Sequence, residues 1–328
     1  MPSFSVVIAT RDRPQLFGQA LASVLAQSWP DLEVIVVNDG SAAEHQPAYQ
    51  SVLDAADPQR VRSFSLVQTP GGHGGSYARN FGAAKANAPY LCFLDDDDCW
   101  TDAGHLARAQ AVIGDSAIPV DLYMTNQAAF LQGVQRPGPI WIEDLPAILA
   151  RLDNRPDRHG AHTVTVEMLL QSQGFCHLNT LIVRRELYEA IGGMEASIRW
   201  EEDRDVYFRL IDRAGMIKYA PVTVARHNIP DPRQTASMTT TLSEIERRLF
   251  QSKVFDRAWH QSSHPAIRAH ARRYKAYTLK RITQLLVAAG RDTEAAHYAR
   301  AALRTSPSVK WAGYTAWRTL RAFVGRRT

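Results

Sequence analysis

Four consecutive aspartates, Asp95 to Asp98, directly follow the apolar run Tyr90–Leu94. Neighbouring carboxylates repel one another, and removing them from water costs free energy unless a cation meets them. Mg²⁺ and Mn²⁺ take oxygen ligands, commonly one or two carboxylates together with substrate phosphates. An acidic run can also be a solvated loop or a helix N-terminus. Because this run ends an expected strand, where α/β sheets bind ligands, we favour a metal site that holds a diphosphate.

Alternating strands and helices precede the acidic run. Apolar, β-rich segments predict four strands, near residues 3–9, 32–37, 61–68 and 89–94. The segments between them have helical spacing, and this alternation predicts an α/β fold with a mostly parallel sheet flanked by helices. From about residue 240 the pattern is helical, with breaks at Pro265, Gly290 and Pro307.

Other polar clusters also follow expected strands. They are residues 10–13, residues 38–41, and the glycine loop 71–75 with Arg79 and Asn80. Because the carboxyl ends of parallel strands share one edge of a sheet, we expect these clusters and the aspartates to line one pocket. The glycine loop has neither the spacing of a dinucleotide fingerprint nor the Gly-Lys-Ser/Thr ending of a P-loop. It can still let a ligand approach the backbone.

Length and composition limit the class of protein. The 328 residues suffice for one large or two modest domains, and 45% hydrophobic with 22% charged residues is typical of a soluble globular chain. Three cysteines without CxxC spacing argue against a disulfide framework or zinc site and for a reducing compartment. The N-terminus lacks a signal-peptide pattern, and no segment has the roughly 18–20 apolar residues of a membrane span. We therefore expect a cytoplasmic location.

The net charge of +5 conceals two oppositely charged regions. Residues 245–328 hold 18 Lys and Arg against four Asp and Glu, whereas residues 1–244 hold 20 against 29. Basic residues mixed with aromatics at helical spacing are compatible with peripheral binding to the anionic inner face of the cytoplasmic membrane. Helical packing with a solvated basic face, and dimerisation through this tail, stay open. Nucleic acid is not favoured, because the tail carries no recognition motif.

The order of the motifs resembles family 2 glycosyltransferases of the GT-A fold. The matching segments are Val6–Pro14, Val34–Ser41, Gly74–Ala84, Phe93–Trp100, Leu181–Gly193 and Glu201–Arg209. The resemblance covers roughly residues 1–230. It implies a catalytic domain over residues 1–238, with a nucleotide-binding half (1–115) and an acceptor-side half (116–238), followed by a basic α-helical region (239–328).

The resemblance implies an enzyme that binds a nucleotide-diphosphate sugar, with a UDP-sugar as the first expectation. Thr10, Arg13 and Asp39 would line the base and ribose site, with Asp39 accepting a hydrogen bond from the base. Arg79 and Asn80 would help to hold the diphosphate. The acceptor would be a hydroxyl of a glycan, a glycolipid or another lipid-linked molecule, in bacterial surface polysaccharide or glycoconjugate synthesis.

The resemblance also assigns metal and catalytic roles. Asp95, Asp96 and Asp97 fill the family's DxD position, with Asp95 and Asp96 among the donor-binding residues and Asp97 as the direct ligand of Mn²⁺ or Mg²⁺. His227 stands where many relatives carry a residue that closes on the metal or diphosphate. Asp203 would be the base that takes the proton of the acceptor hydroxyl, with inversion at the anomeric carbon.

The sequence departs from the family's motifs at two places, and two other functions remain as alternatives to a glycosyltransferase. Asp98 adds a carboxylate to the motif, so the division of labour within the run is open, and Arg11-Asp12 replaces the more frequent aromatic-Asn pair. A nucleotidyltransferase also combines an α/β sheet with metal-binding carboxylates, but it usually has a glycine-rich loop after the first strand, and residues 10–14 contain no glycine. An inactive sugar-nucleotide-binding scaffold is the other alternative. The presence of Asp97 and Asp203 argues against it.

Overall fold

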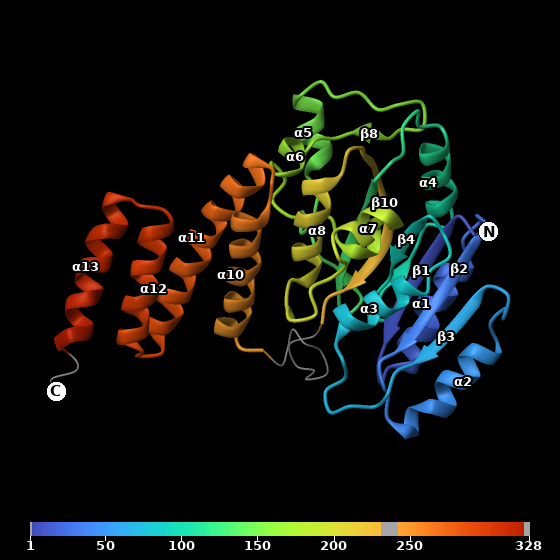
Figure 1. Cartoon of the computed structure of the whole chain (residues 1–328), viewed down its shortest axis with the longest axis horizontal. Helices are drawn as coiled ribbons and strands as arrows, with labels where there is room; N and C mark the ends of the chain where they lie inside the picture. The colour runs from blue at the N-terminus through green and yellow to red at the C-terminus, as the bar shows by residue number, and fades with distance from the viewer. Residues whose placement is uncertain (1, 231–241, 325–328) are drawn as a thin grey trace. The chain divides into compact units, whose positions relative to one another are not determined.

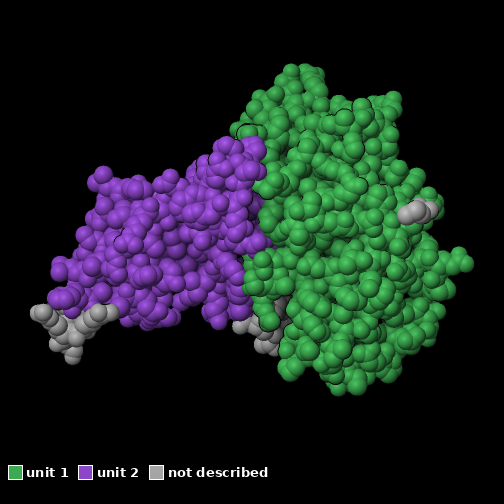
Figure 2. All heavy atoms as spheres, in the orientation of Figure 1, with its two compact units in different colours: residues 1–199, 209–231 green, residues 200–208, 232–328 purple. Residues whose placement is uncertain are grey.

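The computed structural model describes residues 2–230 and 242–324. The chain divides into two compact units, which Figure 2 shows in different colours. The first unit comprises residues 1–199 and 209–231, and the second comprises residues 200–208 and 232–328. The expected domain boundary at residue 238 lies outside the described residues.

The first half of the first unit alternates strands and helices. Its strands all pair in parallel, in the spatial order β3-β2-β1-β4. Six of the seven residues of β1 are buried, as expected for a parallel strand that is covered on both faces. The elements are β1 (Phe4–Thr10), α1 (Pro14–Leu25), β2 (Leu32–Asn38), η1 (Ala43–His45), α2 (Gln46–Asp54), β3 (Val61–Ser65), α3 (Gly75–Ala84) and β4 (Tyr90–Phe93).

The second half of this sheet is mixed. Strand β9 runs antiparallel to both β4 and β6, β10 is parallel to β6, and β5 closes the order antiparallel to β10. The strands are β5 (Cys99–Trp100), β6 (Leu122–Leu131), β7 (Val134–Gln135), β8 (His162–Thr163), β9 (Leu181–Arg184) and β10 (Ile217–Asn228). The helices are α4 (His105–Gly114), α5 (Leu145–Arg151), α6 (Val166–Leu169), η2 (Leu178–Thr180), α7 (Arg185–Ala190) and α8 (Glu202–Arg213).

The pairing brings distant residues to one edge of the sheet. Thr10 at the end of β1 pairs with Asn38 at the end of β2. The acidic run connects β4 to β5, and β5 pairs with β10 through Arg226 and Cys99, so that His227 follows directly beside the run. The polar clusters expected at the strand ends therefore meet. Strand β5 was not predicted, because two residues are too few to show a periodicity.

The second unit is helical, and its helices pack on one another in chain order (Figure 1). Ser243 caps the first of them in a capping box with Glu246, and the breaks fall at the expected Pro265, Gly290 and Pro307. The helices are α10 (Glu244–Gln261), α11 (Pro265–Ala288), α12 (Asp292–Thr305) and α13 (Val309–Val324). Among the described helices, none is both long and apolar enough to cross a bilayer. The expected α/β sheet with flanking helices and a helical C-terminal region is confirmed.

Helix α3 can approach the sheet closely because Gly82 has no side chain. A Cβ at this position would clash with Val7 Cγ1 and lie 3.1 Å from Val37 Cγ2. We expect Gly82→Ala to lower the free energy of unfolding by about 1–3 kcal/mol, because the added methyl group overpacks this contact. Urea denaturation measures the change. Gly114→Ala is the matched control, since a Cβ at this other helical glycine meets nothing closer than 3.6 Å; an equal loss in both variants would contradict the explanation.

Candidate active site

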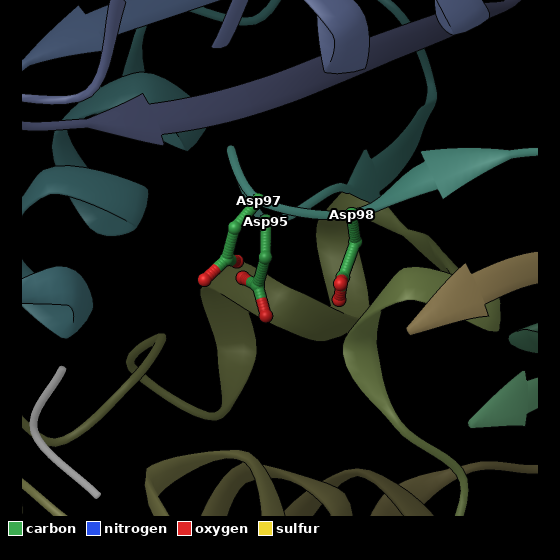
Figure 3. Close-up of side chains that lie close together, drawn as sticks. All are labelled: Asp95, Asp97 and Asp98. Atoms are coloured by element: carbon green, nitrogen blue, oxygen red, sulfur yellow. The ribbon is translucent and has the colours of Figure 1, made fainter. Parts of the chain in front are cut away.

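Three of the four aspartates gather at one point. One carboxylate oxygen each from Asp95, Asp97 and Asp98 lies within 4.8 Å of the others, and Figure 3 shows the three side chains pointing to the same side of the segment that carries them. A backbone hydrogen bond of 3.1 Å from Asp98 to Asp95 folds this segment into a turn. Carboxylate oxygens are the protein ligands that hard divalent cations prefer, and water or phosphate oxygens complete their coordination. The residues present therefore fit Mn²⁺ or Mg²⁺.

Asp96 does not belong to this carboxylate cluster. It is buried, it accepts a hydrogen bond of 2.6 Å from Thr10, and it forms an ion pair of 2.5 Å with Arg13. Burial raises the pKa of Asp96 to about 7, against the opposing charge of Arg13. Thr10 also shares a hydrogen bond of 2.8 Å with the Tyr49 hydroxyl. Asp96 thus links the acidic turn to the end of β1.

Two arginines supply the positive charge that four adjacent carboxylates require. Arg13 lies 2.8 Å from Asp97, and Arg79 of α3 lies 2.5 Å from Asp95. Burial opposes ionisation of Asp95, but the Arg79 guanidinium overcomes it and holds the pKa of this carboxyl well below its usual range. The acidic run is therefore stabilised by the chain's own cations.

Asp98 is held by residues from two other strand ends. It accepts hydrogen bonds of 2.5 Å from the Asn179 side chain and 2.7 Å from the Asn228 backbone, and it pairs with His227 Nδ1 at 2.6 Å. Burial works against a charged His227, but the adjacent Asp98 carboxylate raises the pKa of this histidine to about 9. The structure thus brings His227 to the acidic cluster through Asp98.

The sequence analysis missed a second group of residues at this site. Asn179 also accepts a hydrogen bond of 3.0 Å from the Asp95 backbone, so it contacts both ends of the turn. His177 Nε2 lies 3.9 Å from Asp95, and its ring stands 5.0 Å from that of His227 and 5.8 Å from that of Trp141. These residues precede a strand instead of following one. Only the antiparallel direction of β9 brings its beginning to the edge where the parallel strands end.

The Asp39 carboxylate lies against the glycine loop. It accepts hydrogen bonds of 2.9 Å from the backbone of both His73 and Gly74, and it lies 2.8 Å from the His73 ring. Gly72 has φ +69, and a Cβ there would lie 2.5 Å from an Asp39 oxygen, so this position requires glycine. Asp39, directly after the end of β2, thus holds the loop that leads into the start of α3, where the base site was expected.

Asn80 makes contacts away from the acidic cluster. Its side-chain oxygen accepts hydrogen bonds of 2.7 Å from the Tyr188 hydroxyl and 2.8 Å from the Met194 backbone N–H. Its side-chain nitrogen donates a hydrogen bond of 2.8 Å to the Met194 carbonyl. These bonds attach residues 188–194 to α3. Although Arg79 and Asn80 are adjacent in the chain, the structure brings only Arg79 to the aspartates.

Asp203 lies in the second unit, at the start of α8. Glu201, two residues before Asp203, has a left-handed backbone (φ 58). Its carboxylate accepts a hydrogen bond of 2.8 Å from Gln251 of α10 and forms an ion pair of 3.2 Å with Arg204. Such strain in a non-glycine residue is common at functional sites. Burial, followed by the charges of Glu202 and Glu201, raises the pKa of Asp203 to about 7. The role of Asp203 as a base stays a prediction.

The fold and this site define a class of protein. An α/β sheet of this topology, with a divalent-cation donor set where its strands end, has the architecture of GT-A glycosyltransferases. The sequence pattern of glycosyl transferase family 2 matches residues 5–176, more than half of the chain, and the chain belongs to this family. The expected family and the expected enzyme class are confirmed.

Curated relatives carry related names. The chain is 26% identical over 220 residues to the succinoglycan biosynthesis protein ExoW of Rhizobium meliloti, and the match covers 63% of each chain. It is 33% identical over 101 residues to the GalNAc(5)-diNAcBac-PP-undecaprenol beta-1,3-glucosyltransferase of Campylobacter jejuni, and this match covers 30% of each chain. The matches thus span less than two thirds of these relatives.

Solved structures share the fold. Residues 1–349 of S. aureus TarS in complex with UDP-GlcNAc superpose with a TM-score of 0.64 at 16% identity, covering 94% of this chain and 82% of that one. The mannosyltransferase PcManGT from Pyrobaculum calidifontis, in complex with GDP-Man and Mn²⁺, gives a TM-score of 0.60 at 17% identity and covers 98% of this chain and 81% of that one. At these identities the likeness establishes the fold.

Proposed function

We propose that this glycosyltransferase is an inverting, metal-dependent enzyme that moves a sugar from a nucleotide-diphosphate donor, most readily a UDP-sugar, to an acceptor hydroxyl. The observation that carries this proposal is the cluster of carboxylate oxygens from Asp95, Asp97 and Asp98, bordered by Arg13 and Arg79. It is supported by the two structural neighbours, which were solved in complex with UDP-GlcNAc and with GDP-Man and Mn²⁺.

Donor binding would use the carboxylate cluster and its arginines. Asp97, with Asp95 and Asp98, would hold Mn²⁺ or Mg²⁺, which when bound neutralises the negative charge of the diphosphate leaving group. Arg79 would exchange its carboxylate partner for phosphate oxygens, which guanidinium groups bind in the same forked geometry. Because Arg13 pairs with Asp97, we propose the same role for Arg13, in place of the base and ribose contact that the resemblance implies. Thr10 and Asp39, at the ends of β1 and β2, would face the ribose and base.

Proton transfer would use Asp203. As the acceptor oxygen attacks the anomeric carbon opposite the leaving diphosphate, Asp203 would take the hydroxyl proton, and the configuration would invert. A general base works best when its pKa lies near the operating pH. The pKa of Asp203, raised to about 7 by burial and by its acidic neighbours, suits this role.

This assignment predicts a pH dependence. Because the base must be ionised, the transfer rate should rise with pH through about 7 and level off above it. Glu201→Gln should move this rise to lower pH, because a negative charge that raises the pKa of Asp203 is removed. Initial rates at saturating donor, measured beside donor affinity over the same pH range, test the effect. Superimposable profiles for the two enzymes would contradict it.

The acceptor is proposed to be a hydroxyl of a glycan or a lipid-linked molecule, in bacterial surface polysaccharide or glycoconjugate synthesis. The names of the two curated relatives support this class, since one is a succinoglycan biosynthesis protein and the other acts on an undecaprenol-linked glycan. The enzyme would work in the cytoplasm, peripherally at the inner face of the membrane, through its basic C-terminal helices. Dimerisation through these helices is the competing use of the same region.

A screen of nucleotide sugars tests the donor proposal. A ligand that binds only the folded state stabilises that state by RT ln(1 + [L]/Kd), so the midpoint of thermal unfolding rises with the logarithm of the ligand concentration once that concentration exceeds the dissociation constant. We expect a UDP-sugar to stabilise the chain in Mn²⁺ and to do so much less in EDTA. The anomeric coupling constant of the product then reports inversion. Equal stabilisation with and without metal would remove the cation from donor binding.

A further inference from the structure

Helix α13 carries a continuous apolar surface that faces away from its neighbour α12. Four large side chains on it are exposed: Val309 (92%), Leu320 (64%), Phe323 (57%) and Trp317 (49%). At 3.6 residues per turn, the apolar positions of this surface fall within an arc of roughly 140°. We call this surface the outer ridge, and it consists of Val309, Ala312, Gly313, Ala316, Trp317, Leu320 and Phe323.

The orientation of the outer ridge is set by the opposite face of α13. Trp311 donates a hydrogen bond of 2.9 Å to the Ala299 carbonyl of α12, and Thr315 is buried against the same helix. Arg318 is 5% exposed and pairs with Asp292 at 3.0 Å. The ion pair of the buried Arg318 with the partly exposed Asp292 and the tryptophan hydrogen bond fix which side of α13 packs, so the ridge cannot turn inward by a simple rotation of the helix.

Positive charge borders the outer ridge on both edges. Lys310 and Arg321 follow it on one side of the helix, and on the other side Arg300 of α12 donates a hydrogen bond of 3.3 Å to Thr319. Arg321 also lies 5.8 Å from the centre of the Trp317 ring. Helix α13 contains no acidic residue. An apolar arc with tryptophan and phenylalanine, between cationic edges, is the pattern of helices that lie in the plane of a membrane interface.

From this pattern we infer that the outer ridge of α13 docks the protein on an anionic lipid surface. The apolar side chains would enter the boundary between headgroups and acyl chains, while Lys310, Arg321 and Arg300 would contact lipid phosphates. A second copy fits less well, because a two-fold contact through the same ridge would bring basic edges against basic edges. The inference rests on the proposed function in one respect: a lipid-linked acceptor gives the docking its use.

Vesicle binding by the full chain tests this inference. We expect co-sedimentation with vesicles of phosphatidylcholine and phosphatidylglycerol, and much weaker binding to phosphatidylcholine alone. Leu320→Ser with Phe323→Ser should lower the partition coefficient at least about tenfold, because two large apolar side chains no longer leave water. Lys310→Gln with Arg321→Gln should reduce the preference for phosphatidylglycerol and its salt dependence. Ile118→Ser with Val134→Ser, at exposed positions of the first unit (52% and 69%), is the matched control.

Two results would overturn the inference. One is equal vesicle binding by the wild type and by the Leu320→Ser, Phe323→Ser variant, with circular dichroism confirming that both are folded. The other is a dimer in light scattering that this variant dissociates while vesicle binding is unchanged, which would assign the ridge to self-association. The metal-dependent thermal shift with a UDP-sugar should be the same in all variants. Its absence from the wild type would refute the donor proposal and leave the vesicle result standing.

Discussion

Asp203→Asn is expected to abolish sugar transfer while leaving donor binding intact. The amide is nearly isosteric and can still accept the 2.8 Å hydrogen bond from the Arg204 backbone, but it cannot take the acceptor proton. Loss of general-base assistance lowers a rate by about 10²–10⁴-fold. The measurements are turnover with the best donor of the thermal screen and calorimetric affinity for that donor in Mn²⁺.

A second aspartate serves as the control for this substitution. Asp153 is 80% exposed, and its left-handed backbone (φ 48) is one that asparagine also adopts, so Asp153→Asn should keep full activity. Turnover retained in Asp203→Asn would remove Asp203 from its proposed role. Loss of donor affinity together with turnover would instead point to a binding role for Asp203.

The second large effect is expected from Asp97→Ala, which should weaken metal-dependent nucleotide binding by tenfold or more. Loss of a residue that only orients metal ligands already costs about 10–100-fold in metal affinity, so loss of a direct ligand should cost at least as much. Asp97 lies in the carboxylate cluster and pairs with Arg13 at 2.8 Å. Calorimetry with UDP in Mn²⁺ and in EDTA separates the metal contribution, and affinity in EDTA should change little.

Asp96 provides the contrast that makes this experiment specific. It is buried between Thr10 and Arg13 and lies outside the carboxylate cluster, so Asp96→Asn should mainly lower the free energy of unfolding. We expect affinity for UDP in Mn²⁺ to fall far less than in Asp97→Ala. The reverse order of the two affinities would mean that the cluster in Figure 3 is not the metal site.

Much of the fold could be predicted from the sequence because its signals are local. Buried parallel strands are uniformly apolar, and their helices keep a 3.6-residue spacing, so β1 to β4 and the helices between them lie within a few residues of their expected positions. The breaks between the C-terminal helices fall at the proline and glycine residues where the sequence predicted them. Strands β5, β7 and β8 have two residues each and carry no such pattern.

The candidate site was predicted where its residues follow parallel strands. Thr10, Arg13, Asp39, Arg79 and the acidic run could be grouped because the ends of parallel strands must share an edge. Asn179 and His177 could not, since they precede β9, and the direction in which a strand pairs depends on contacts between segments far apart in the chain. Asn80 carries the same motif signal as Arg79, but packing turns its side chain toward Met194.

The sequence by itself determined the kind of chemistry, because four carboxylates after a buried strand require cations. A positive charge excess confined to about the last quarter of the chain separates a basic helical region from an acidic body. Only the tertiary structure decided how the four aspartates divide their work. The turn that carries them directs Asp95, Asp97 and Asp98 to one point and Asp96 into the protein, toward Thr10 and Arg13. Adjacent side chains leave a turn in different directions. Whether a given direction meets solvent, a cation or a buried hydroxyl depends on segments that lie more than 80 residues away in the chain.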